Sequence, residues 1–148
     1  MTHYAGRCHC ENVEVEFNTA LSIDKLLLRA DQCSFCRKHG ARTTSDPKGS
    51  LRITVHDSKL FLRYRFGLKT ADFLVCTGCG IYVAAVLSAG ASSYATLNIN
   101  TLGKAAEIAR EGRPVRYDSE SPSERTERRI QNWTPTVMEF EERRPHGG

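Results

Sequence analysis

Short apolar or alternating runs recur through the first hundred residues, and Gly, Pro, Asp or Ser bound most of them. The clearest run covers residues 13–17, where valine and phenylalanine alternate strictly with glutamate. Such alternation is typical of a strand that turns one face to the core and the other to water. By the same criteria, strands are predicted at residues 13–17, 25–30, 51–55, 60–64, 73–75, 81–87 and 94–99. The sequence therefore predicts a mainly β fold.

Two helices are predicted in the last third of the chain. Residues 101–110 carry a weak helical pattern. Residues 122–132 carry a stronger one, since Ser121 can cap the helix and Pro122 suits its first position. Trp133 follows and is expected to pack the tail back on the body of the protein, with exposed stacking on a ligand as the alternative.

The length of 148 residues suits one domain, and 40% apolar with 26% charged residues is ordinary for a globular protein. One domain over residues 1–148 is therefore predicted, in which residues 101–148 pack on the rest and residues 143–148 fray. The longest apolar run, residues 81–87, is far shorter than the roughly 20 residues that span a bilayer. Residues 1–10 contain no apolar stretch of the kind that a secretory signal needs. We expect a cytoplasmic location and no membrane partner.

The net charge of +4 does not favour nucleic acid as a partner. Residues 110–148 hold eight arginines against eight acidic residues, so the excess lies in residues 1–109, as 13 basic against 9 acidic side chains. These charges are spread thinly rather than gathered in a stripe. The chain also lacks glycine-rich phosphate loops, a nucleophile elbow and an H-E-x-x-H helix. The function must therefore be argued from the cysteines.

The six cysteines form three close pairs: Cys8/Cys10, Cys33/Cys36 and Cys76/Cys79. Three disulfides are one explanation, but a reducing cytosol disfavours them, and cysteines two or three positions apart are poorly placed to bridge each other. Metal binding explains the pairs better, because each short turn delivers two thiolates to the same side of a zinc tetrahedron.

The last pair lies in a turn with Gly78 inside it and Gly80 after it, which allows the tight backbone that wraps around a metal. Cys10 and Cys76 lie 66 positions apart, so a shared zinc ion would pin the N-terminal strand to the middle of the chain. Structural zinc contributes roughly 10–16 kcal/mol in zinc-finger peptides, comparable to the whole stability of a small domain. The predicted ligands of a structural zinc site are Cys8, Cys10, Cys76 and Cys79.

The middle pair, Cys33 and Cys36, offers only two thiolates, but Asp31 could add a carboxylate oxygen. Three protein ligands with one open position form the arrangement of catalytic zinc. Asp31, Cys33 and Cys36 are thus predicted as a catalytic metal site, with Arg37 or Lys38 beside it to hold an anion. A simple turn role for Asp31 is an equal alternative.

Two further roles for residues near these pairs are less well supported. His9 and His39 lie close by, but a histidine beside a cysteine turn is more often a surface group or a hydrogen-bond partner of a ligand, so neither is included among the ligands. Cys33 and Cys36 would also suit a redox dithiol. A thioredoxin-like dithiol, however, lies between a strand and a helix in an alternating βα pattern, which the predicted elements lack.

Three segments together resemble the glutathione-dependent formaldehyde-activating enzyme family, whose members are also described as centromere protein V-like. The segments are Gly6-Arg7-Cys8-His9-Cys10 with the strand after it, Cys33-Ser34-Phe35-Cys36-Arg37-Lys38 with Gly40-Ala41, and Phe73-Leu74-Val75-Cys76-Thr77-Gly78-Cys79-Gly80. They span residues 6–80, about half of the chain, in the family's order and approximate spacing.

The resemblance implies an Mss4-like fold of coiled antiparallel β-sheets with zinc-binding turns and one or two short helices. It also implies two zinc ions, one structural, and one catalytic that a glutathione thiolate approaches while adding to formaldehyde. Such an enzyme is a carbon–sulfur lyase that yields S-hydroxymethylglutathione. Its partners are a glutathione-like thiol and a small aldehyde. The implied structural ligands are Cys8, Cys10, Cys76 and Cys79.

The chain departs from the family's pattern at two positions. Asp31 stands where the family has the first cysteine of a C-x-C-x-x-C turn, and a harder oxygen ligand changes the charge, affinity and softness of that site. Glu11 stands where many relatives have glycine, which implies a slightly different turn. The first departure supports a competing hypothesis, in which the chain is a non-catalytic zinc module that binds protein or nucleic acid and its second metal site has decayed.

Overall fold

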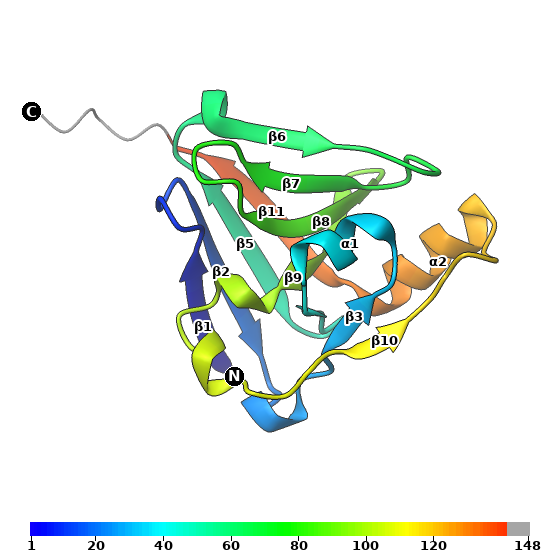
Figure 1. Ribbon diagram of the computed structural model, residues 1–148, viewed down its shortest axis with the longest axis horizontal. Helices are drawn as coiled ribbons and strands as arrows, with labels where there is room; N and C mark the ends of the chain where they lie inside the picture. Colours follow the sequence, from blue (N-terminus) through cyan, green and yellow to red (C-terminus); the bar gives the residue numbers. More distant parts are fainter. Residues whose placement is uncertain (142–148) are drawn as a thin grey trace, which may run out of the picture.

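The computed structural model describes residues 1–141, and strands dominate it (Figure 1). The strands of this part of the chain are β1 (Thr2–Arg7), β2 (Val13–Thr19), β3 (Arg29–Asp31), β4 (Thr43–Thr44), β5 (Ser50–Val55), β6 (Phe61–Tyr64), β7 (Asp72–Cys76), β8 (Tyr82–Ala89), β9 (Ser92–Asn98), β10 (Arg113–Val115) and β11 (Thr134–Phe140). The α-helices are α1 (Ser34–His39) and α2 (Pro122–Asn132), and the short 3-10 helices are η1 (Ile23–Lys25), η2 (Ser58–Leu60), η3 (Ile99–Thr101) and η4 (Ala105–Glu107). The prediction of a mainly β fold with short helices is confirmed. The predicted fraying of residues 143–148 falls outside the described residues.

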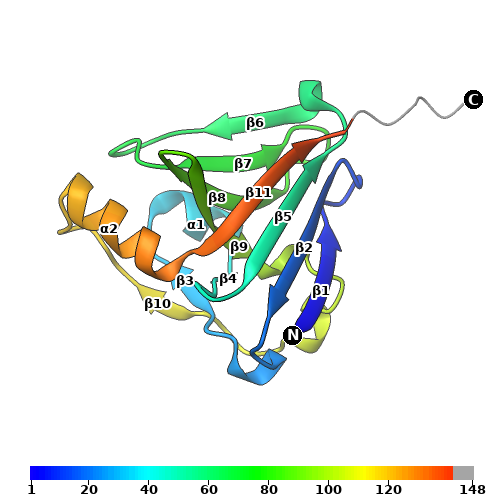
Figure 2. The same cartoon turned by 180° about the vertical axis from the view of Figure 1, so that it is seen from behind.

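The eleven strands found in residues 1–141 form one mixed sheet that branches at β9. One path runs β1-β2-β5-β11-β9-β4-β3-β10, and β8, β7 and β6 follow from the other edge of β9. Leu97 marks the branch, because it pairs with Thr44 of β4 and with Ala84 of β8. Two pairs are parallel, β5 with β11 and β3 with β10. Figure 2 shows β11, the last strand, beside β5 rather than at an edge, and its other pairing partner is β9.

The alternation that predicted residues 13–17 as a strand is the pattern that builds the main core. In both β2 and β5, every second side chain is at most 2% exposed, and all of these except Thr19 are apolar. These core residues are Val13, Val15, Phe17, Leu51, Ile53 and Val55. Each such side chain contributes roughly 1.5–3 kcal/mol by leaving water. The opposite face carries charged pairs, such as Arg52 with Glu139 at 3.1 Å.

Residues 25–30 were predicted as a strand, and this prediction is largely wrong. The segment begins in η1 and reaches the sheet only at Arg29, where β3 starts. Leu26 and Leu28 are buried while Leu27 is 48% exposed. The alternation therefore reflects an extended segment lying on the core, without strand neighbours along most of its length.

The prediction of a helix at residues 101–110 is wrong as well, because this segment contains the end of one short 3-10 helix, η3, and all of a second, η4. The backbone here pairs with β1 instead of closing an α-helix. Leu102 forms a bridge with Gly6, and the N–H of Gly103 donates to the carbonyl of Ala5 at 3.0 Å. Groups used in this way are not free for helical hydrogen bonds.

The second predicted helix is confirmed as α2. Ser121 accepts a hydrogen bond from the Glu124 N–H at 3.2 Å, and the Glu124 carboxylate accepts one from the Ser121 N–H at 3.1 Å. This is a complete capping box, with Pro122 at the first helical position. Trp133 is 6% exposed and packs with Leu87 in a second core cluster, as predicted. Neither α2 nor any other helix in residues 1–141 has the length and apolar character needed to cross a membrane.

Candidate metal centres

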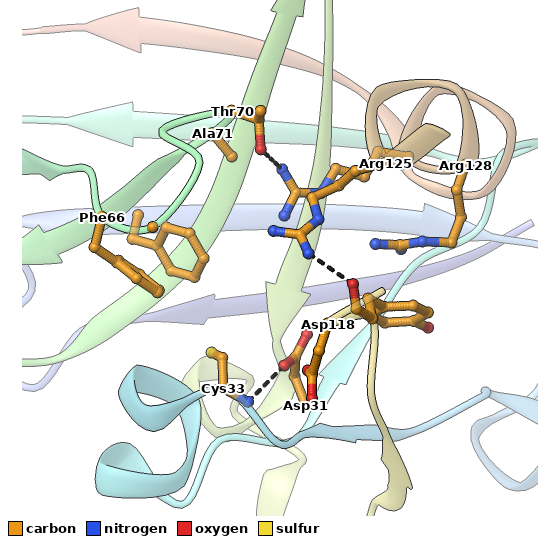
Figure 3. A pocket seen from close by; sticks show the side chains of 12 residues that line it. Asp31, Cys33, Phe66, Thr70, Ala71, Asp118, Arg125 and Arg128 are labelled. Carbon is orange, nitrogen blue, oxygen red and sulfur yellow. Dashed lines mark hydrogen bonds between the residues drawn. The ribbon is translucent and has the colours of Figure 1, made fainter. Parts of the chain in front are cut away.

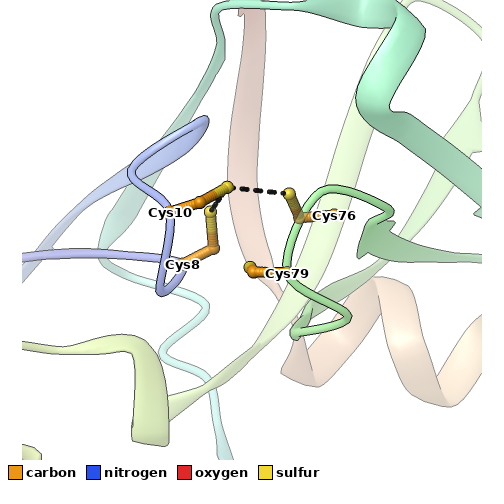
Figure 4. Close-up of side chains that lie close together, drawn as sticks. All are labelled: Cys8, Cys10, Cys76 and Cys79. Atoms are coloured by element: carbon orange, nitrogen blue, oxygen red, sulfur yellow. Dashed lines mark hydrogen bonds between the residues drawn. The ribbon is translucent and has the colours of Figure 1, made fainter.

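Four cysteines from two distant parts of the chain meet between the loop after β1 and the turn that ends β7 (Figure 4). The sulfurs of this cluster lie within 4.8 Å of one another, and its members are Cys8, Cys10, Cys76 and Cys79. The Sγ of Cys10 is 3.5 Å from that of Cys76 and 3.9 Å from that of Cys8. Tetrahedral zinc with Zn–S bonds of about 2.3 Å separates its sulfurs by about 3.8 Å. The four donors therefore fit a zinc ion.

The backbone of the second turn leaves room around these sulfurs. Gly80 has a φ of +82°, and its N–H donates to the carbonyl of Cys76 at 2.7 Å. A Cβ at Gly78 would lie 3.3 Å from the sulfur of Cys10, closer than an ordinary van der Waals contact. Glycine is therefore favoured at position 78 by the lack of space and at position 80 by the positive φ, as the sequence suggests.

The first turn contains a non-glycine residue in the left-handed region. Glu11 has a φ of +70°, a conformation that costs an L-residue roughly 1–2 kcal/mol and glycine almost nothing. A glycine at this position would adopt the same backbone conformation without that cost. The Glu11 side chain lies at the surface, 3.2 Å from Arg7.

Asn12 is a supporting residue of this cluster that sequence reasoning missed. Its Oδ1 accepts a hydrogen bond from the Asp57 N–H at 2.7 Å, and its Nδ2 donates to the carbonyls of Asp57 and Leu60 at 3.1 and 3.3 Å. Asn12 is buried and ties the first cysteine turn to η2, just before β6. Its position two residues after Cys10 was the only signal in the sequence.

The thiols of the four-cysteine cluster differ in acidity without a metal. Burial raises the pKa of Cys8 to about 12. Burial also acts to raise the pKa of Cys79, but hydrogen bonds from the backbone of Cys10 and Ile81 lower it to about 6. Cys79 is therefore readily available as a thiolate near neutral pH, whereas a cation that recruits Cys8 must displace its proton.

The second cluster joins the end of β3 to the start of α1. The donor atoms of Asp31, Cys33 and Cys36 lie within 4.8 Å of one another. Asp31 Oδ1 accepts a hydrogen bond from the Cys33 N–H at 2.9 Å, and Cys33 Sγ accepts one from the Cys36 N–H at 3.4 Å. Cys33 is thus the N-cap of α1, which ends at Gly40 with a φ of +58°. The carboxylate of Asp31 does take the turn role that was the alternative to ligation.

The two thiols of this cluster also differ from each other. The hydrogen bond between the two side chains lowers the pKa of Cys33, whereas the same bond, together with burial, raises the pKa of Cys36. Cys33 is half-buried and Cys36 is only 4% exposed. Two soft sulfurs and one hard oxygen make a donor set that zinc accepts, and they leave one of its four positions open.

Several alternatives from the sequence can now be compared with the structure. All six cysteines are free, so the disulfide explanation is wrong. Neither His9 nor His39 belongs to either cluster, and the His39 ring packs against Phe35 with 4.5 Å between centroids. Cys33 does lie between β3 and α1, and Cys36 lies within α1, a helix that was not predicted. The order of the described elements nevertheless shows no alternating βα pattern.

A cavity of about 80 Å³ lies beside the second cluster (Figure 3). Asp31 and Cys33 line it on one side, and Arg125, Arg128 and Arg129 of α2 line it as well. Figure 3 shows Arg125 and Arg128 reaching in from the helix, across from Asp31 and Cys33. The cavity is therefore bounded by candidate metal ligands and by a group of cations.

The arginines of this cavity replace the cations expected from the sequence. Arg37 and Lys38 were expected to hold an anion, but both are exposed on α1 and neither lines the cavity. Arg125, Arg128 and Arg129 were missed because α2 lies far from Cys33 in the chain, and only tertiary packing brings it there.

The fold and the two clusters define a class, a mainly β protein with two groups of candidate metal ligands. The sequence model of the glutathione-dependent formaldehyde-activating enzyme family matches residues 3–116, and the chain therefore belongs to this family. It is also similar to the crystal structure of a Rhodobacter sphaeroides protein, with 28% sequence identity and a TM-score of 0.57 over 74% of this chain and 97% of that chain. No curated protein gave a significant match. The resemblance seen in the sequence is confirmed.

Proposed function

We propose that the protein is a zinc-dependent carbon–sulfur lyase that adds a thiol such as glutathione to a small aldehyde such as formaldehyde. Membership of the formaldehyde-activating family supports this type of reaction. The observation that carries the proposal is that Asp31 and Cys33, two of the three donors of the second cluster, line a cavity. A metal held by these three donors would lie beside the cavity, and three protein ligands would leave the fourth position that catalytic zinc keeps for water or substrate.

Zinc bound at this cluster would supply the positive charge that lowers the pKa of a coordinated thiol. In the addition, the sulfur forms a bond to the carbonyl carbon, and the carbonyl π electrons move to the oxygen. This oxygen takes up a proton equivalent to the one that the thiol lost, so atoms and charge balance. With glutathione and formaldehyde the product is S-hydroxymethylglutathione.

The residues of the cluster have separate tasks in this proposal. Asp31, Cys33 and Cys36 hold the ion. The N–H of Cys33 orients the Asp31 carboxylate, and the N–H of Cys36 orients the Cys33 sulfur, so two of the three donors have their positions before a metal binds. Preformed donors reduce the ordering that binding requires.

The four-cysteine cluster has a structural task in the same proposal. Its four sulfurs complete a zinc tetrahedron and leave no position for a substrate. A single domain over residues 1–148 and a cytoplasmic location also belong to the proposal, since six free thiols persist best in a reducing compartment.

The test is the zinc content of freshly purified protein, measured by elemental analysis for the wild type and for Asp31→Ala. We expect two ions per wild-type chain and one per variant chain, with loss of the glutathione-dependent consumption of formaldehyde. Asp24→Ala is the matched control, because Asp24 is an exposed acidic residue outside both clusters. One ion in all three proteins, without activity, would refute the lyase and support the non-catalytic zinc module.

A further inference from the structure

Arg129 is a buried cation on which the negative charges of Asp31 and Glu120 act without direct contact. It is only 8% exposed and forms no ion pair within residues 1–141. Its Nη1 donates to Thr70 Oγ1 at 2.8 Å, and its guanidinium lies over the Trp133 ring, 4.7 Å from the centroid. Its Nε is buried and has no hydrogen-bond partner among the described residues. A buried charge in this state is unfavourable unless an anion pairs with it.

The two arginines beside it share one carboxylate. Arg128 donates to Glu120 at 2.7 and 3.0 Å and lies over the Tyr117 ring, 3.4 Å from its centroid. The Nε of Arg125 is 3.5 Å from Glu120, while its Nη2 donates to the Tyr117 carbonyl at 2.7 Å. Burial, and then the charges of Arg128 and Arg125, lower the pKa of Arg129 to about 10, so it stays charged at neutral pH.

Two acidic residues line the cavity, and neither forms an ion pair with Arg129. Asp118 is exposed and lies 3.8 Å from Arg116. Asp31 lies across the cavity from the α2 side chains and is a donor of the candidate metal site (Figure 3). When Asp31 holds a divalent cation, its charge is neutralised there. Asp118, which already lies beside Arg116, is then the remaining acidic residue in the lining of the cavity, and it forms no ion pair with Arg129.

We propose that this cavity is a carboxylate subsite, in which Arg129, with Arg125 beside it, binds the carboxylate of a small substrate whose reacting group lies at Asp31 and Cys33. This inference rests on the proposed function and deepens it by naming a substrate class. Arginine suits the task, because its planar fork of donors matches a carboxylate. Arg129 also lies outside residues 3–116, so the proposed binding of a carboxylate does not follow from the family match.

The size of the cavity limits what it can enclose. Its volume of about 80 Å³ is roughly that of two to three liquid waters, and pockets for drug-sized ligands begin at about 300 Å³. It therefore holds a carboxylate on a short arm. The rest of a tripeptide thiol would lie outside the cavity.

The test compares an acidic thiol with a neutral one of similar size. Mercaptoacetate and 2-mercaptoethanol are titrated calorimetrically into the zinc-loaded full chain, at constant ionic strength. We expect mercaptoacetate to bind at least about tenfold more tightly, and Arg129→Gln to reduce the difference to less than about twofold. Arg113→Gln is the control, because it removes the same charge from an exposed position on β10, outside the cavity.

A second variant covers the case in which Arg129→Gln does not fold. Arg129→Lys keeps the charge and most of the packing but loses the forked geometry, so we expect an intermediate preference at an unchanged melting temperature.

A second arm of the test places the carboxylate on the aldehyde. Glyoxylate is compared with acetaldehyde, and 2-mercaptoethanol is the thiol in both cases. A preference in one arm alone identifies the substrate that carries the acid. Equal binding of acid and neutral probe in both arms, or a preference that both Arg129 variants retain in full, overturns the proposal.

The two proposals fail in different ways. If mercaptoacetate is preferred through Arg129 but no thiol–aldehyde adduct forms faster than without protein, the lyase is refuted and the carboxylate subsite stands. If adducts form at equal rates with acidic and neutral probes, and Arg129→Gln changes nothing, the lyase stands and the subsite is refuted.

Discussion

The sulfur of Cys10 lies 3.5 Å from the sulfur of Cys76, although 66 positions separate the two residues in the chain. This contact joins the loop after β1 to the end of β7, two strands that are not neighbours in the sheet. A metal shared between them would close a long loop and constrain the unfolded chain as well as the folded one. The stability of the fold should therefore depend on this cluster.

Replacing Cys76 by serine should remove one zinc ion and most of the cooperative unfolding transition. Cys76 is fully buried, and a structural zinc ion contributes roughly as much free energy as a small domain has in total. Circular dichroism melts combined with elemental analysis measure both effects. Cys33→Ser is the matched control, since it makes the same change in the other cluster and should cost one zinc ion while the protein stays folded. Unfolding of both variants would contradict the division into a structural and an open site.

The sheet was predictable wherever apolar side chains face the core, as in β2 and β5. The strand β11 was missed because its pattern is inverted. Thr134 and Thr136 are buried, whereas Val137 and Phe140 are 57% and 49% exposed. Its place beside β5 comes from a parallel pairing between residues far apart in sequence, which no local pattern indicates.

The metal clusters were predictable to the extent that they are local. A C-x-C or C-x-x-C turn places two sulfurs together by itself, so spacing alone suggested which cysteines pair. The helix α1 was missed because its six residues have no apolar periodicity and its N-cap is Cys33, a residue type rarely found there. The α2 arginines could not be assigned to the cavity, because their position depends on how the helix packs.

Gly6→Ala should destabilise the protein by roughly 2–4 kcal/mol. A Cβ at Gly6 would lie 2.6 Å from the Cα of Leu102 and closer still to the carbonyl oxygen of Thr101, and both are backbone atoms that cannot move aside cheaply. Urea unfolding measures the change from the shift in the midpoint. Gly103→Ala serves as the control, because its new Cβ would meet nothing nearer than the Ala5 oxygen at 3.6 Å. Equal midpoints for the two variants would disprove the close packing of β1 on η3.

Asp31→Cys should raise the zinc affinity of the second cluster about tenfold or more. The substitution replaces a hard oxygen donor by a soft thiolate at a position whose donor atom already lies within 4.8 Å of both sulfurs. Competition with a chromophoric chelator measures the affinity. Asp31→Asn is the companion variant, which keeps the size and the turn hydrogen bond but loses the charge, and it should bind zinc more weakly. If neither substitution changes the zinc affinity, Asp31 is not a zinc ligand and only stabilises the turn before α1.

Glu120→Gln should lower the melting temperature at neutral pH but not in acid. Two hydrogen bonds from Arg128 hold the pKa of Glu120 below its ordinary value of 4.5. A carboxylate whose pKa is lower in the folded than in the unfolded state stabilises the fold above its unfolded pKa, and this contribution disappears as the pH falls through the folded pKa. The difference between wild type and variant should thus be full at pH 7 and shrink progressively below pH 4.5.

Melting temperatures of both proteins between pH 7 and pH 3 measure this difference, and comparing them at the same pH cancels the effects of other groups. Glu127→Gln is the control on α2, the helix that carries Arg128, because Glu127 is exposed and forms no ion pair within the described residues. It should leave the melting temperature nearly unchanged at every pH. A Glu120→Gln effect that persists undiminished in acid would mean that the side chain acts through packing, because the ion pair with Arg128 is lost once the carboxyl group is protonated.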